Sequence, residues 1–153
     1  MLCMASWRLK APDGTSLGQQ FCSQRFSYCL DYPASMFSKT YISPKEDSLV
    51  FTTLDTYGQV SVISTASDHK LDSHQAFDQR MRALSGTTGE APLVLSIING
   101  DDYYEVNFLF DARWYHQKAG FYRTHDVLFS LQVPVNRPEL MMRLNEDVRI
   151  VFD

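Results

Sequence analysis

Residues 93–110 read LVLSIINGDDYYEVNFLF, and this stretch decides the fold. The apolar run at 93–98 leads into Asn99-Gly100, the strongest two-residue signal for a β-hairpin turn. Over 103–110 the side chains alternate between two faces, as in a strand with one buried face. Because a slip of one residue in register would exchange these faces, the turn determines which side chains reach the core. Tyr104, Val106, Phe108 and Phe110 share one face, and Tyr103, Glu105, Asn107 and Leu109 share the other.

Further strands are indicated by short runs rich in β-branched and aromatic residues. Residues 49–54 and 60–65 are joined through Asp55 and Gly58, so we expect them to pair as an antiparallel hairpin. An alternating run at 26–32 stops at Pro33. Two more strands are predicted around 114–123 and 127–133.

Two amphipathic helices are predicted from capping signals and apolar spacing. Asp72 and Gln75 form a capping box, and the helix that follows is expected to end at Gly86. Asn136 and Glu139 give a second capping box. Pro138 suits a first helical turn, and this second helix is expected to run to the end of the chain. The apolar stripes are Phe77, Met81 and Leu84 in the first helix and Met141, Leu144 and Val148 in the second.

Length and composition agree with one globular domain. A chain of 153 residues with 44% hydrophobic and 21% charged residues is too apolar for disorder and is the length of a single domain. About six or seven mostly antiparallel strands and two helices, each with one apolar face, predict an α+β fold. We expect a sheet covered by the two helices in an α/β/α-type sandwich.

Charge limits the kinds of partner. The sequence has 14 Lys and Arg against 18 Asp and Glu, a net charge of −4, so nucleic acid is not an expected partner. No run approaches the roughly 20 apolar residues that cross a bilayer, so no transmembrane segment is expected.

The start of the chain suggests export. Residues 1–6 read MLCMAS, an apolar run ending in small residues, which resembles the last part of a signal peptide. We therefore predict an amino-terminal extension at 1–20, a domain at 21–153 and a periplasmic or secreted protein. A cytoplasmic protein with a frayed start is the alternative. Cys22 and Cys29 either form a disulfide or remain two reduced thiols.

The order of the elements resembles that of PsbP-like domains. The resemblance rests on the strand at 26–32 ending in Tyr32-Pro33, on Phe121-Tyr122-Arg123 before the strand at 127–134, and on the terminal amphipathic segment from Asn136. This fold occurs in the photosystem II extrinsic subunit P, in a Ran-binding nuclear import factor and in small bacterial envelope proteins. The resemblance implies binding rather than chemistry, and it carries no functional residue across.

Signatures of catalysis and of cofactor binding are missing from the sequence. It has no Gly-x-Ser-x-Gly elbow and neither of the glycine-rich phosphate-binding motifs. We therefore predict no catalytic residue, no cofactor and no enzymatic activity.

An acidic and aromatic patch is the candidate binding site. Asp101, Asp102 and Tyr103 lie at the predicted hairpin tip, and exposed carboxylates beside aromatic residues suit a basic protein partner. A solvated turn is the alternative interpretation. Trp114, Tyr115 and His116 would extend the patch if their strand lies next to the tip, although Trp114 is equally consistent with the core.

These observations predict a non-catalytic protein-binding module of the bacterial envelope, such as an immunity protein or an assembly factor. The alternative is a domain that binds a small molecule or a metal, with modest enzymatic activity. Its ligands would be His116 and His125, facing each other across a hairpin near Ala119-Gly120, or a cluster before the first helix. The members of this cluster are Asp68, His69, Asp72 and His74. We favour the interpretation of Asp72 as a helix cap over a metal ligand.

Overall fold

The computed structural model describes residues 2–3, 18–67 and 72–152, which form two antiparallel sheets and two α-helices. The larger sheet has seven strands in the order β4-β5-β6-β10-β9-β8-β7, and the smaller has four in the order β1-β2-β3-β11. The strands are β1 (Leu2–Cys3), β2 (Gln19–Ser23), β3 (Tyr28–Tyr32), β4 (Phe37–Ile42), β5 (Ser48–Thr53), β6 (Gln59–Ala66), β7 (Leu93–Asn99), β8 (Tyr103–Phe110), β9 (Arg113–Phe121), β10 (His125–Pro134) and β11 (Arg149–Phe152). The helices are α1 (Ser73–Thr88) and α2 (Pro138–Asp147), with a 3-10 turn at Ala34–Met36.

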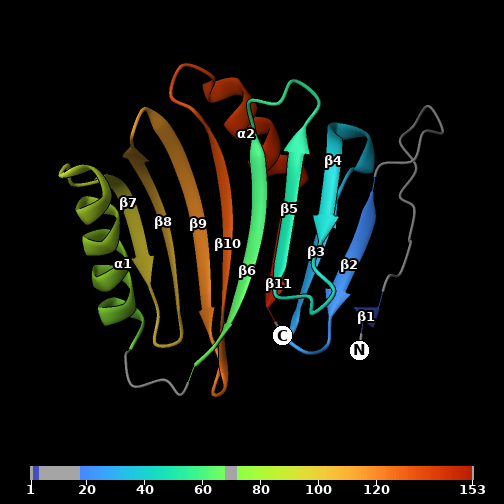
Figure 1. Ribbon diagram of the computed structural model, residues 1–153, viewed down its shortest axis with the longest axis horizontal. Helices are drawn as coiled ribbons and strands as arrows, with labels where there is room; N and C mark the ends of the chain where they lie inside the picture. Colours follow the sequence, from blue (N-terminus) through green and yellow to red (C-terminus); the bar gives the residue numbers. More distant parts are fainter. Residues whose placement is uncertain (1, 4–17, 68–71, 153) are drawn as a thin grey trace.

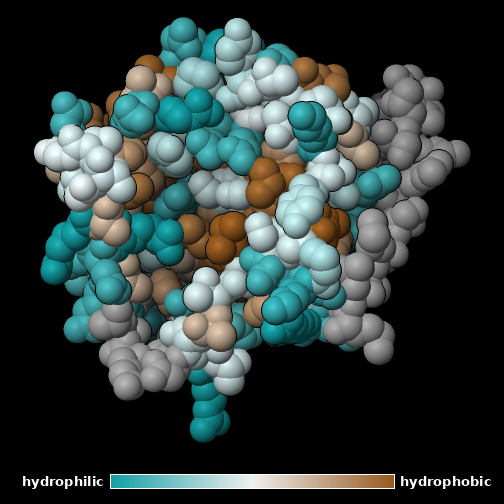
Figure 2. Space-filling view, in the orientation of Figure 1, coloured by the Kyte–Doolittle hydropathy of each residue, from teal (hydrophilic) through white to brown (hydrophobic). Residues whose placement is uncertain are grey.

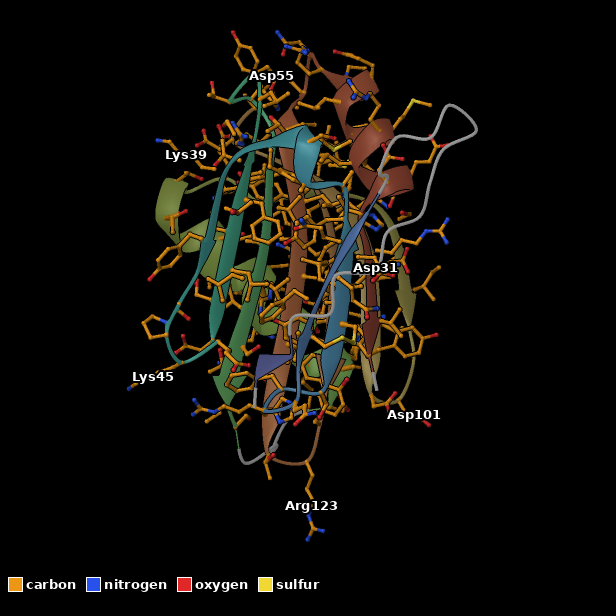
Figure 3. The ribbon with its side chains drawn as sticks, turned by 90° about the vertical axis from the view of Figure 1, so that its right-hand side faces the viewer. Asp31, Lys39, Lys45, Asp55, Asp101 and Arg123 are labelled. Carbon is orange, nitrogen blue, oxygen red and sulfur yellow. A yellow bond between two sulfur atoms is a disulfide. The ribbon has the colours of Figure 1, made fainter. Side chains whose placement is uncertain are left out.

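The helices cover opposite faces of the larger sheet. α1 packs on the face that we call the outer face, where Phe77 contacts a cluster formed by β8 and β9. α2 and the smaller sheet pack on the other, inner face (Figures 1 and 3). The α+β fold with helices on both faces of an antiparallel sheet is therefore confirmed. The smaller sheet was not anticipated, because the run at 26–32 was expected to join a single sheet.

The β7–β8 hairpin is confirmed with Asp101 and Asp102 at its tip, as expected, but these two residues form the turn in place of Asn99-Gly100. Gly100 N–H donates to Tyr103 O at 2.9 Å, so Asp101 and Asp102 form the turn itself. A side chain at Gly100 would collide with the ring of Tyr103, and this close contact explains the glycine. The expected turn at Asn99-Gly100 is therefore wrong in position.

Helix α1 begins as predicted and ends later. The Asp72 carboxylate accepts from Gln75 N–H at 2.8 Å, and the Gln75 side chain accepts from Asp72 N–H at 3.1 Å, which completes the capping box. Gly86 lies inside the last turns, and Gly89, with a φ of 80°, provides the left-handed cap. Gly86 is therefore not the end of the helix.

Helix α2 differs from prediction at both ends. Its N-cap is Arg137 without a side-chain cap, so the capping box expected of Asn136 and Glu139 is absent; Glu139 instead pairs with the Arg137 guanidinium. The helix stops at Asp147, and Val148 turns the chain into β11, which pairs with β3. The apolar Ile-Val-Phe at 150–152 suits either element, so spacing alone did not separate them.

Strand β4 was missed because it is an edge strand with little buried surface. Of its side chains only Phe37 is buried, and Lys39 and Tyr41 are exposed. A strand with few buried positions lacks the apolar alternation on which sequence analysis depends.

The disulfide left open by the sequence is present. Cys22 and Cys29 are direct partners in the β2–β3 hairpin, with Cα atoms 4.1 Å apart, and their sulfurs are bonded. The bond lies between strands that also bury Phe21 and Leu30 in the main core. It therefore links the two strands that hold the smaller sheet on the inner face.

The packing of α2 gives a stability prediction. Leu144 is fully buried against the core, whereas Met142 on the same helix is 67% exposed. Leu144→Ala is expected to lower the free energy of unfolding by about 2–5 kcal/mol, through lost burial and a cavity. Met142→Ala is the matched control and should change it by less than about 0.5 kcal/mol. Urea unfolding measures both; equal effects of the two substitutions would contradict this packing.

Candidate functional site

A pocket of about 430 Å³ opens on the inner face, where the sheet extends beyond α2. Its floor comes from β7, β8 and β9, and its wall comes from α2. Direct pairing places Asn107 between His116 and Ser96 across three strands. The lining residues are Leu95, Ser96, Glu105, Asn107, Trp114, His116, Met141, Met142 and Asn145.

Asn107 organises the polar floor of this pocket. Its Oδ1 accepts from Trp114 Nε1–H at 3.2 Å and lies 3.0 Å from His116 Nδ1. Its Nδ2 donates to Ser96 Oγ at 3.1 Å. Because an indole nitrogen can only donate, Trp114 determines which end of the Asn107 amide faces it.

The same amide determines the tautomer of His116. Asn107 Oδ1 can only accept, so His116 Nδ1 carries a proton, and in the neutral ring Nε2 is left with its lone pair. Nε2 is buried and lies 3.6 Å from Glu105 Oε1, too far for a hydrogen bond. Within the described part of the chain, Nε2 has no hydrogen-bond partner.

Burial keeps His116 neutral. The residue is only 5% exposed, and this burial lowers the pKa of its imidazole below the usual 6.5. The Glu105 carboxylate acts in the opposite direction and Lys118 in the same direction, but burial is the largest cause. At neutral pH the pocket therefore holds a neutral imidazole beside a carboxylate.

The structure separates the residues of the predicted patch. Trp114 and His116 lie together in the pocket described above. Asp102 and Tyr103 line a second hollow near the end of β11, which Gly120 and Phe152 also line. In Figure 3, the label of Asp101 marks the end of the molecule where the β7–β8 turn lies.

Tyr115 lies on the other side of the sheet. Its ring stacks on Phe108 of the outer face, with centroids 4.9 Å apart. The six residues therefore do not form one surface, because neighbours along a strand point to opposite faces.

The proposed pairing of His116 with His125 is wrong. The β9–β10 turn lies beyond Phe121, so His116 is opposite Leu131 and His125 is opposite Ala66 of β6. His125 Nε2 is 2.9 Å from Phe26 O, which ties two distant segments together.

The cluster before α1 is only partly described. Asp72 is the helix cap, and His74 is an exposed neighbour of Asp78. Asp68 and His69 lie outside the described residues. Over residues 18–67 and 72–152, no three His, Cys, Asp or Glu side chains gather as metal ligands.

Sequence analysis missed two features of this region. The first is the contact of Glu105 and Asn107 with His116. Both residues were placed on the correct face of their strand, but this contact depends on the β8–β9 register. The second feature is β7, a free edge of the larger sheet in which all seven residues are exposed. Its exposed apolar side chains are Leu93, Val94, Leu95, Ile97 and Ile98.

Comparison with known proteins identifies the fold. The chain is similar to cyanobacterial PsbP (CyanoP) from Synechocystis sp. PCC 6803, solved in solution, with a TM-score of 0.64 over 92% of this chain and 96% of that one. The chain has a PsbP-like fold. The resemblance noted in the sequence is thus confirmed, although the identity of 14% establishes the fold alone.

Other comparisons add no family. No family model matches the sequence, and no curated protein matches it. Neither α1 nor α2 of the described chain has the length and apolar character to cross a membrane. For this PsbP-like domain, function has to be argued from its surfaces.

The buried imidazole predicts a pH dependence of stability. His116 has a lower pKa in the folded chain than in the unfolded chain. Its contribution to the free energy of unfolding is therefore complete above about pH 6.5 and is lost at lower pH, because protons then bind to the unfolded chain. We expect the free energy of unfolding to fall from about pH 6.5 downwards, and to fall less in His116→Gln. Urea titrations between about pH 7.5 and 5 measure this. His74→Gln, on the exposed side of α1, is the control and should retain the wild-type slope; equal slopes in wild type and His116→Gln would contradict the prediction.

Proposed function

We propose that this protein is a non-catalytic protein-binding module of the bacterial envelope, and that its partner docks along β7. The observation that carries the proposal is the exposure of this strand. Leu93 is 60% exposed and Ile98 is 58% exposed, on a strand whose outer edge pairs with no other strand among the residues that the structure describes. Proteins normally protect such edges with charge, proline or a covering segment, because unpaired backbone groups recruit another strand.

The opposite edge of the larger sheet supports this interpretation by contrast. β4 carries mainly polar exposed residues, including Lys39, and its neighbours β5 and β6 expose Thr52 and Ser61 in part on the outer face. Figure 2 shows the outer face as mostly hydrophilic around a small apolar area. Exposed apolar side chains are therefore concentrated along β7, whereas elsewhere on the sheet they are scattered, as at Tyr41 and Ile63. A partner strand at β7 would gain backbone hydrogen bonds and apolar burial together.

Location in the envelope is supported by the disulfide. Bonds such as Cys22–Cys29 persist in the periplasm and outside the cell, and cytoplasmic reductants remove them. Within the envelope, the proposed role is that of an immunity protein or an assembly factor that recognises its partner through this strand.

A small-molecule site is the second candidate function. The pocket beside α2 has about 430 Å³ and a polar floor, which are features of ligand sites. Because His116 and His125 do not face each other, the pocket is the observation that supports a small-molecule site.

The β7 proposal predicts loss of partner capture when the edge is charged. Leu93→Lys combined with Ile97→Lys places a cation on each face of β7, and neither residue lines the pocket. We expect at least about a tenfold loss of the partner recovered by chemical cross-linking and affinity purification from the native envelope. Cross-links of the wild-type protein should map to β7.

The control is Tyr41→Lys combined with Ile63→Lys, which are 56% and 40% exposed elsewhere on the sheet. This variant should retain the partner, and urea unfolding should show both variants folded. Equal recovery with both variants would refute docking at β7. Loss of self-association in the β7 variant, with no second protein recovered, would also refute it, since a second copy would then cover the strand.

The proposed location has its own test. When the protein from its native host is alkylated without reductant, we expect Cys22 and Cys29 to remain unmodified in peptide mass spectrometry. After reduction both should be modified, and in Cys22→Ser the unpaired Cys29 should be modified without reductant. Modification of both cysteines in the unreduced native protein would place it in a reducing compartment.

A further inference from the structure

The floor of the α2 pocket holds two hydrogen-bond acceptors that face each other. Glu105 Oε1 lies 3.6 Å from His116 Nε2, whose lone pair is directed there by the tautomer that Asn107 sets. Among the residues that the structure describes, the buried His116 Nε2 has no hydrogen-bond partner, and Lys118 Nζ stays 3.9 Å from Glu105 Oε2. A buried acceptor without a donor is costly, so this floor is incomplete.

We propose that the pocket binds the guanidinium group of an arginine side chain that the protein partner presents when it docks along β7. This inference rests on the proposed function and gives the partner's chemistry. β7 contributes Leu95 and Ser96 to the pocket floor, so a segment on β7 lies next to the opening.

The chemistry of the lining fits arginine at both ends. Met141, Met142 and Trp114 offer apolar and polarisable surface to the methylene stem, while the Glu105 carboxylate attracts the charged head. A planar guanidinium presents several N–H groups and can donate to a carboxylate and to a neighbouring acceptor together. The Glu105 side chain is 36% exposed, so an incoming head group can reach its carboxylate from solvent, beside His116 Nε2.

An organic cation fits this floor better than a metal ion does. Only His116 and Glu105 meet as ionisable ligands in the pocket, and no group of three forms within the described chain. Protein sites for zinc have at least three protein ligands. A guanidinium needs only acceptors and an apolar channel, both of which are present.

Lys118 competes for the same carboxylate. Its ammonium is the cation nearest to Glu105, and both side chains are about one-third exposed. An exposed pair of this kind contributes little to stability, so an incoming arginine can replace it. Removing Lys118 should therefore strengthen binding, whereas removing Glu105 should weaken it.

The experiment uses the full chain and a capped arginine, N-acetyl-L-arginine amide, followed by NMR of the histidine side-chain nitrogens. The control ligand is N-acetyl-L-citrulline amide, which has nearly the same shape and no charge. We expect the arginine compound to shift the His116 Nε2 signal with a dissociation constant on the order of 1 mM, and the citrulline compound to bind at least about tenfold more weakly. Glu105→Gln should abolish the difference, and Lys118→Met should strengthen arginine binding.

Several results would overturn the inference. Equal shifts by the arginine and citrulline compounds, or no shift at His116, would exclude a guanidinium site. Free L-arginine binding far more tightly than the capped compound would identify a free amino acid as the ligand instead. Zn²⁺ perturbing the same signals at micromolar concentration, without an effect of the arginine compound, would identify a metal site.

Variants separate this inference from the proposed function. Leu93→Lys with Ile97→Lys should lose the partner and still bind the arginine compound, while Glu105→Gln should lose the arginine compound and weaken partner capture. If partner capture depends on β7 and is unchanged in Glu105→Gln, arginine binding in the pocket is refuted and docking along β7 is still supported.

Discussion

The larger sheet is covered on opposite faces at opposite ends, and the rest of the structure follows from this arrangement. α1 packs on the outer face over β8 and β9, whereas α2 and the smaller sheet pack on the inner face over β4, β5, β6 and β10. Only the middle of the sheet is protected on both sides. Val127 and Phe129 of β10 face the inner core, and Leu128 between them packs against the outer cluster.

Polar groups gather at the end of the inner face that α2 and the smaller sheet leave uncovered. From β10 outwards, the row that begins at buried Leu131 continues through His116 to Asn107 and Ser96. Each step moves farther from α2 and the smaller sheet, so the side chains change from apolar to hydrogen-bonding types. The pocket is thus the border between the main core and the open end of the sheet.

Much of the fold was predictable because local signals and burial agree. The β5–β6 hairpin, the start of α1 and the alternation of β8 all follow from turn residues, a capping box and apolar spacing. β4 and β11 were not predictable in the same way. β4 buries too little surface, and β11 follows α2 through a single residue, Val148, while remaining apolar in either conformation.

The candidate site was only half predictable for a related reason. Trp114 and His116 were recognisable by type, but their partners come from β8, and the register depends on the position of the β9–β10 and β8–β9 turns. A shift of one residue would have placed Tyr115 in the pocket instead of His116. The exposure of β7 was also hidden, because an apolar run such as 93–98 usually indicates a buried strand.

The His116–Glu105 pair contains residues of catalytic type, yet its orientation favours binding. In a catalytic triad a carboxylate holds Nδ1–H and leaves Nε2 facing a nucleophile. Here an amide holds Nδ1, and Nε2 faces the carboxylate, so neither group is directed at a hydroxyl. Ser96, the pocket's own hydroxyl, accepts from the other end of that amide and belongs to the same network. An arrangement that sets two acceptors against each other and fixes the imidazole from behind is suited to holding a cation.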